Sequence, residues 1–190
     1  MCGIVGILGR SFDPIDAMTS ALSHRGPDAG AVWLDTDGGV ALGHRRLSIV
    51  DLSEAGAQPM HSPSGRFVLV FNGEIYNHLE LRQLLGYTLW RGHSDTETLL
   101  AAIEAWGLEK ALSHSVGMFA FALWDTRERY LFLARDRMGE KPLYYGWQGR
   151  AFLFASELKA LCRHPAFGAD IDRGALANYQ IGRASCRERV

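Results

Sequence analysis

MCGIVGILG occupies residues 1–9 and places a cysteine directly behind the initiator methionine. Residues 3–8 are small or apolar and have the length of a short buried strand. A thiol at a chain end adds little stability, because termini fray unless another part of the protein holds them. The N-terminus is therefore predicted to be a core strand, and Cys2 is either a chance residue or a group placed there for chemistry.

The composition is that of a globular protein, with 190 residues, 47% of them hydrophobic and 22% charged. A net charge of −1 gives no basic surface for nucleic acid or for an anionic membrane. No apolar run approaches the roughly 20 residues of a transmembrane helix, and the N-terminus lacks the basic flank of a signal peptide. We expect a cytoplasmic protein that binds neither nucleic acid nor membranes.

The three cysteines, Cys2, Cys162 and Cys186, are far apart and odd in number, so neither a disulfide framework nor a metal site is predicted. Cys186 lies in residues 181–190, IGRASCRERV, which show no apolar periodicity. These ten residues can be back-translated to a common sequencing adapter. We therefore predict one native domain over residues 1–180, followed by adapter read-through; a disordered basic tail is the alternative.

Short apolar runs of strand length recur in pairs. Residues 31–35 and 40–44 flank the turn TDGG, which indicates a hairpin. Residues 66–71, RFVLVF, form a continuous apolar run typical of a strand buried on both faces. Two more pairs follow, at 118–125 with 129–136 and at 142–147 with 151–155.

Helices are predicted mostly between these pairs. One covers residues 14–22, with Asp13 as its N-cap, and another follows the capping-box spacing Asn77–Glu80. A third begins at the capping box Ser94–Glu97 and ends at Gly107, and a last one covers residues 156–162. The order lacks the regular alternation of a parallel α/β fold, so we expect two packed sheets with helices outside.

Cys2 becomes chemically special if Met1 is removed, because its thiol and a free α-amine then share one residue. The amine has an unperturbed pKa of about 7.7–8.0 and can act as a base near neutrality. The thiol, with an unperturbed pKa of about 8.5, is a strong nucleophile once deprotonated. A nucleophile and its base on one residue are the N-terminal-amine form of an activated nucleophile.

FNGEIYNH, residues 71–78, contains an Asn-Gly pair, which after a strand normally marks a tight hairpin turn. A helix rather than a return strand is predicted next, so the hairpin interpretation is weak. The Asn72 side-chain amide and the Gly73 backbone N–H are instead candidate donors to a developing oxyanion.

Two further charged residues are candidates for binding a zwitterion. Arg46, in HRRLSIVD, can hold a carboxylate through two parallel hydrogen bonds, although a surface salt bridge is the simpler interpretation. Asp95, in SDTE, can bind an amino group, although a carboxylate in the first turn of a helix is favoured by the helix dipole alone.

Taken in order, seven segments resemble one known family: MCGIVGI, HRGPD, GHRRLSIVD, FNGEIYNH, SDTE, RDRMGEKPLYY and FASELKAL. Over residues 1–180 the chain resembles the type-II glutamine amidotransferase domain, particularly that of the glutamine-hydrolysing asparagine synthetases. The resemblance implies an α+β fold of the N-terminal nucleophile hydrolase type. That fold is a four-layer α-β-β-α sandwich of two mainly antiparallel sheets, in agreement with the strand and helix pattern.

The resemblance also implies a role for each matching residue. Cys2 matches the nucleophile, Asn72 and Gly73 match the oxyanion donors with Glu74 beside them, and Asp95 matches the aspartate that binds the α-amino group of glutamine. The segment that holds the α-carboxylate of glutamine is matched by Arg46, Leu47, Ser48, Ile49 and Val50. No role follows for HRGPD or for RDRMGEKPLYY.

The implied activity is hydrolysis of glutamine to glutamate and ammonia without a cofactor or metal. In the full family the ammonia passes to a C-terminal domain that uses ATP and Mg to activate aspartate. The nucleotide loop SGGxDS of that domain is absent here, so ATP, Mg and the synthetase domain are expected in a missing C-terminal part. The alternatives are the same glutaminase on another acceptor domain, such as one for cell-surface polysaccharide, or an inactive regulatory module. The resemblance leaves a homodimer open.

Overall fold

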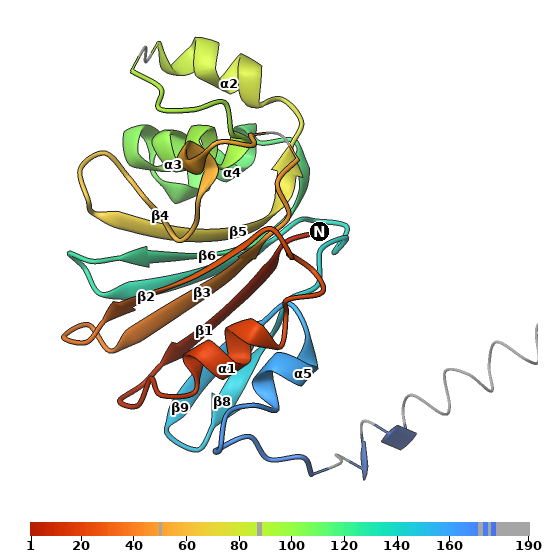
Figure 1. Cartoon of the computed structure of the whole chain (residues 1–190). Coiled ribbons are helices and arrows are strands. Elements are labelled where there is room, and N and C mark those ends of the chain that lie inside the picture. Colours follow the sequence, from red (N-terminus) through yellow and green to blue (C-terminus); the bar gives the residue numbers. More distant parts are fainter. Residues whose placement is uncertain (50, 87–88, 171–172, 175, 178–190) are drawn as a thin grey trace, which may run out of the picture.

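Four layers of secondary structure make up the protein (Figure 1). The computed structural model describes residues 1–49, 51–86, 89–170, 173–174 and 176–177. Two antiparallel sheets lie face to face, and helices cover the outer face of each sheet. The expected α+β architecture, an α-β-β-α sandwich, is therefore confirmed. None of the helices in the described part is long and apolar enough to span a membrane.

The N-terminal strand lies at the centre of a five-stranded sheet with the order β2-β3-β1-β9-β8. Its strands are β1 (Gly3–Leu8), β2 (Ala29–Asp35), β3 (Val40–Arg46), β8 (Tyr144–Gln148) and β9 (Ala151–Ala155). The helices α1 (Ile15–Ser20) and α5 (Leu158–Leu161) cover its outer face. A central strand so close to the chain end is held on both sides, which prevents the fraying expected of a terminus.

The second sheet has four strands in the order β4-β5-β6-β7. They are β4 (Met60–His61), β5 (Phe67–Ile75), β6 (Gly117–Asp125) and β7 (Tyr130–Arg135). Its outer face is covered by α2 (His78–Leu85), α3 (Asp95–Trp106) and α4 (Leu108–His114). A short 3-10 helix, Glu54–Gly56, lies in the loop that joins β3 of the first sheet to β4 of the second.

Each boundary between layers has its own apolar cluster, because successive side chains of a strand point to opposite faces. In β1, Val5 packs against α1 and α5, whereas Ile4 faces the other sheet. In β5, Phe71 packs against the helices above the sheet, whereas Val70 faces the first sheet. The strand that the sequence predicted to be buried on both faces is buried in this way.

The same alternation decides where two candidate residues point. Cys2 lies two residues before Ile4, and Asn72 lies two residues after Val70. Both therefore extend from the inner faces of the sheets, toward the space between them.

Gly6 has a packing role rather than a chemical one. A Cβ atom at this position would lie 2.3 Å from the ring of Phe154, which fills the space between the sheets. The glycine lets an aromatic side chain pack directly against the backbone of β1.

One predicted helix cap is wrong, and a second is correct in position but not in its side-chain bond. Asp13 does not cap α1, since Pro14 holds the N-cap position and no side chain bonds to the first turn. Asn77 holds the N-cap position of α2, as predicted, but its side chain does not bond to the helix. Its Oδ1 accepts from the N–H of Val116 at 2.9 Å, and its Nδ2 donates to the carbonyl of His114 at 2.9 Å. The approach to β6 offers this side chain better-placed partners than its own helix does.

The predicted capping box at α3 is half correct. The Ser94 hydroxyl accepts from the N–H of Glu97 at 3.2 Å, as predicted. The Glu97 carboxylate, however, accepts from the N–H groups of Arg91 and Gly92 in the preceding loop. The helix ends before Gly107, as predicted, but α4 begins directly after it and was not predicted.

His44 of β3 is buried between the sheets and bonds across to β5. Its Nε2 donates to the carbonyl of Phe71, 3.2 Å away, because a carbonyl can only accept. Burial lowers the pKa of this histidine to about 4, although the bond to Phe71 opposes the change.

Because of His44, we expect the free energy of unfolding to be about 2 kcal/mol lower at pH 5 than at pH 7. Since the folded-state pKa is about 4 and the unfolded value about 6.5, the unfolded chain binds the proton first as the pH falls. The loss begins near pH 6.5 and is complete near pH 4. Urea unfolding of wild type and of His44→Gln, which keeps an N–H donor, tests this. The same pH dependence in both proteins would contradict it.

Candidate active site

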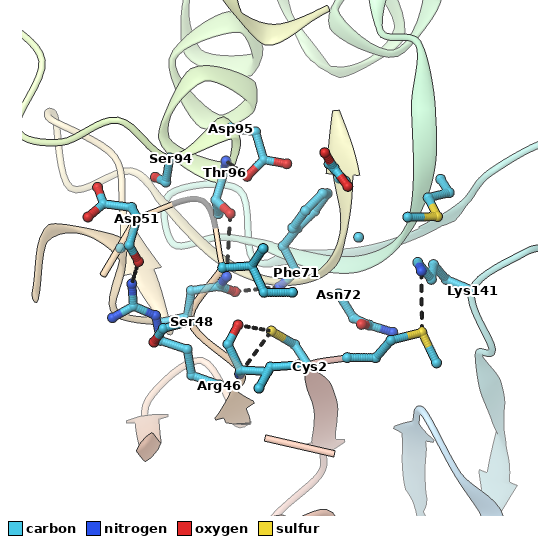
Figure 2. Close-up of a pocket in the computed structure, with 18 residues that line it drawn as sticks. Cys2, Arg46, Ser48, Asp51, Phe71, Asn72, Ser94, Asp95, Thr96 and Lys141 are labelled. Carbon is cyan, nitrogen blue, oxygen red and sulfur yellow. Dashed lines mark hydrogen bonds between the residues drawn. The ribbon is translucent and has the colours of Figure 1, made fainter. Parts of the chain in front are cut away.

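A pocket of about 130 Å³ lies where the N-terminus meets the end of β5 (Figure 2). Every predicted site residue that the structure describes lines it: Cys2, Arg46, Leu47, Ser48, Ile49, Asn72, Gly73, Glu74 and Asp95. Val50, the remaining prediction, lies outside the described residues, as does Cys186. The fold thus gathers Cys2, just before β1, and residues of β3, β5 and α3 into one cavity.

Cys2 is held at the floor of this pocket by backbone and side-chain contacts. Its Sγ lies 3.4 Å from the Leu47 N–H, which donates to it, and 3.6 Å from the Leu47 carbonyl. The Arg25 guanidinium donates from Nε to the carbonyl of Cys2 at 2.9 Å. The thiol is partly buried and faces the cavity (Figure 2).

Arg25 connects the motif HRGPD, to which it belongs, with the motif FASELKAL. The sequence assigned no chemical role to either motif. Its second nitrogen donates to Glu157, at the start of α5, with a separation of 2.9 Å. Burial would raise the pKa of Glu157, but hydrogen bonds from Arg25, His24 and Lys159 lower it to about 2. HRGPD and FASELKAL therefore form one ion-paired support for the backbone of Cys2.

Asn72 and Gly73 lie inside β5, which continues to Ile75, so the Asn-Gly pair is neither a turn nor the end of the strand. The Asn72 side chain is 1% exposed, and its buried Nδ2 has no hydrogen-bond partner among the described residues. A Cβ atom on Gly73 would lie 2.3 Å from the carbonyl oxygen of Met118. Glycine is required here because β6 passes so close.

The N–H groups of β5 show how Gly73 is directed. Phe71 and Ile75 donate to side chains rather than to β6, to Gln58 Oε1 at 2.6 Å and to Asp95 Oδ2 at 2.8 Å. Gly73 lies between them, and alternate N–H groups of a strand point the same way. Its N–H therefore points away from β6 and toward the pocket, beside the Asn72 amide.

Asp95 begins α3 at the far end of the pocket and is 5% exposed. Burial raises its pKa, although the N–H groups of Ile75 and Thr96, each 2.8 Å from one carboxylate oxygen, oppose the change. Each oxygen accepts one of these bonds and keeps a further lone pair. The arrangement suits a cationic partner in the pocket.

Arg46 does not form the surface salt bridge that was the simpler interpretation. Its guanidinium donates to the carbonyl of Ser53 at 2.9 Å and to the carbonyl of Asp51, which orients it along the pocket wall. The Ser53 hydroxyl and the His93 N–H lower the pKa of the Asp51 carboxylate to about 2. Asp51 thus connects the loop after β3 with the loop before α3.

Several pocket residues were not predicted: Asp51, Gly56, Gln58, Ser94, Thr96, Met118 and Lys141. Asp51 and Lys141 belong to the motifs GHRRLSIVD and RDRMGEKPLYY, so the motifs marked them without giving a role. Gln58 and Met118 carry no local signal, since only their tertiary contacts bring them to the site. In the described part of the chain, no group of three or more His, Cys, Asp or Glu side chains is arranged to hold a metal ion.

Comparisons with known proteins identify relatives of this chain in sequence and in fold. The chain is 42% identical to asparagine synthetase (glutamine-hydrolyzing) 3 of Bacillus subtilis, over 93% of this chain and 30% of that protein. It is 41% identical to asparagine synthetase (glutamine-hydrolyzing) 1 of the same organism, over 94% of this chain and 29% of that protein. The chain thus spans about 30% of the length of these relatives.

A solved structure of glutamine phosphoribosylpyrophosphate amidotransferase from B. subtilis is similar as well. It has a TM-score of 0.72 and 26% sequence identity, covering 85% of this chain and 43% of that chain. The fold is therefore the N-terminal nucleophile type that the sequence implied. The family described as the glutamine amidotransferase domain matches residues 1–189. The chain belongs to the glutamine amidotransferase family, and its domain is of type II, related to the N-terminal region of the asparagine synthetases.

Proposed function

We propose that this domain hydrolyses glutamine to glutamate and ammonia through a thioester on Cys2. The observation that carries the proposal is the pair of donors beside Cys2. The buried Asn72 Nδ2 has no partner in the described part of the chain, and the Gly73 N–H lies on the same edge of β5 as those of Phe71 and Ile75, in a residue that lines the cavity. Leaving such a donor unpaired costs stability, so a role with an incoming acceptor explains its retention.

Glutamine is oriented by its two ends in this proposal. The Asp95 carboxylate binds the α-ammonium group, and Arg46, with the backbone of residues 47–50, binds the α-carboxylate. These contacts lie on the side of the pocket away from the Met1 end of Cys2, which directs the side-chain amide toward the thiol (Figure 2).

The chemistry begins when the free α-amine of Cys2 takes the thiol proton, directly or through a water. The thiolate attacks the side-chain carbonyl carbon of glutamine, and Asn72 and Gly73 donate to the resulting oxyanion. The amine returns its proton to the leaving nitrogen, and ammonia departs. Water then attacks the γ-glutamyl thioester, which releases glutamate and restores the thiol.

The domain would be the glutaminase part of a longer cytoplasmic enzyme that makes asparagine from aspartate, glutamine and ATP. The similarity to two asparagine synthetases supports this acceptor. ATP and Mg would bind in the synthetase domain, and this domain would need neither. Residues 1–180 as the native domain and 181–190 as adapter read-through remain predictions, which resequencing the locus would test.

Ammonia release tests the proposal directly. The chain with Met1 removed should release ammonia and glutamate from glutamine without ATP, and the matched Cys2→Ala chain should not. No asparagine should form when aspartate and ATP are added. Equal ammonia release by both chains would contradict the role of Cys2. Asparagine formation by residues 1–180 alone would contradict the proposal that this domain is only the glutaminase part of a longer enzyme.

Asp95→Asn should raise the KM for glutamine about 10- to 100-fold and lower kcat less, because hydrogen bonds to a charged group are worth about 1.5–3 kcal/mol. The α-ammonium group is remote from the reacting amide, so its contact is the same in ground and transition states. Steady-state kinetics measures both effects. Glu104→Gln removes a carboxylate of the same helix outside the pocket and serves as the control. A larger effect on kcat than on KM would contradict the assignment.

A further inference from the structure

Lys141 is a buried cation at the Met1 end of the pocket, on the side of Cys2 away from Arg46 (Figure 2). The residue is 6% exposed, and its Nζ lies 3.3 Å from the sulfur of Met1. A thioether is a weak acceptor, and buried lysines normally have a carboxylate partner. No carboxylate of the described residues forms an ion pair with Lys141.

The loop that carries Lys141 does not depend on its side chain. The Asp136 carboxylate accepts from the backbone N–H of Lys141 at 3.1 Å. The Arg135 guanidinium donates to the carbonyl of Lys141 at 2.6 Å. These bonds hold the backbone whatever the side chain is, so burial of the ammonium group calls for another explanation.

Removal of Met1 changes the surroundings of Lys141. The sulfur leaves, and the nitrogen of Cys2 changes from an amide into a basic α-amine. Lys141 contacts Met1, the residue bonded to that nitrogen, and both line the pocket with Cys2, so removal of Met1 leaves the ammonium group and the new amine at the same end of the pocket. A positive charge in a partly buried pocket disfavours a second positive charge beside it.

We propose that Lys141 is an electrostatic partner of the mature N-terminus. The positive charge of Lys141 favours the uncharged α-amine of Cys2 over its ammonium form. The inference rests on the proposed function, in which this amine is the base that activates the thiol. Lys141 is a positioning residue in this sense, because it acts through the amine and not on glutamine.

Other charged groups belong to the elements around the pocket: Arg25 with Glu157, Arg46 with Asp51, Glu74 of β5, Asp95 of α3, and Asp136 and Glu140 near Lys141. Arg25 approaches the carbonyl of Cys2, but Glu157 offsets its charge. Glu74 and Asp95 line the pocket and favour a protonated amine. Lys141 opposes their effect from the N-terminal side.

The test measures the N-terminal amine itself. In mature chains carrying Cys2→Ala, which removes the thiol, the acetylation rate of the N-terminal amine by acetic anhydride is followed by mass spectrometry across pH. Adding Lys141→Met should raise the pH midpoint of this amine by about one unit, and Lys141→Arg should leave it nearly unchanged. Lys110→Met removes a lysine of α4 that does not line the pocket and is the control. An unmoved midpoint in Lys141→Met would overturn the inference.

The pH profile of glutaminase activity gives a second measurement. With Cys2 present, Lys141→Met should move the midpoint of the acidic limb of kcat/KM to higher pH by the same amount. The value of kcat/KM should fall about tenfold below the midpoint and change little above it. A loss by one factor at every pH would overturn the inference. A mature chain that hydrolyses no glutamine, but whose amine midpoint moves with Lys141→Met, would overturn the proposed function and support the role of Lys141.

Discussion

A chain that retains Met1 should fold and fail to hydrolyse glutamine. While Met1 is attached, the nitrogen of Cys2 is an amide and has no lone pair basic enough to take the thiol proton. Loss of a general base alone lowers the rate by roughly 10²–10⁴-fold. Met1 also lines the pocket, with its sulfur beside Lys141, so it occupies space that the mature site would leave open. We therefore expect weak glutamine binding as well as lost turnover.

The test uses an N-terminal extension that cannot be trimmed, with the N-terminus checked by mass spectrometry beside the ammonia assay. The control carries the same extension with a protease site directly before Cys2, so that cleavage exposes the amine. Activity should return on cleavage, and a cleaved Cys2→Ala chain should stay inactive because it lacks the thiol. Full activity in a preparation shown to retain Met1 would remove the free amine from the mechanism.

Asn72→Ala should lower kcat by roughly 10²–10³-fold with little change in KM, because the oxyanion forms only on the way to the transition state. The structure adds an expectation about stability. Among the described residues the buried Nδ2 of Asn72 has no partner, so Asn72→Ala removes an unpaired donor and breaks no hydrogen bond of that donor. The melting temperature should therefore fall only through the loss of side-chain packing.

Steady-state kinetics together with thermal unfolding separates the two effects. Gln58→Ala provides the comparison, since Gln58 lines the pocket but accepts from the N–H of Phe71 and supports the strand. It should lower stability more than Asn72→Ala does. If Asn72→Ala raises KM and leaves kcat unchanged, Asn72 binds glutamine and is not an oxyanion donor.

Much of the fold could be predicted because its pairings are local. The hairpins β2–β3, β6–β7 and β8–β9 join strands that are neighbours in the chain, so apolar runs and polar turns were sufficient to predict them. The cap at Asp13 was wrong, and the Asn77 side chain does not bond to its own helix, because a capping pattern describes only the local competition for backbone N–H groups. Asn77 found its partners at His114 and Val116 instead.

The sequence alone determined the chemical groups of the site and the order of the motifs that carry them. Cys2, Arg46, Asn72 and Asp95 could be proposed because each residue type has a limited chemistry. The continuous apolar run of residues 66–71 also predicted a strand buried on both faces.

Only the tertiary structure decided which of these groups meet and how they are directed. The N–H groups of Phe71 and Ile75 bond to side chains from other segments, which shows that this edge of β5, with the Gly73 N–H between them, faces away from β6. Arg25 bonds both to the carbonyl of Cys2 and to Glu157, the N-cap residue of α5. Such contacts join residues far apart in the chain, and their energy depends on a geometry that forms when the layers pack. A local pattern therefore names the groups, but the packed sheets set the distances at which they act.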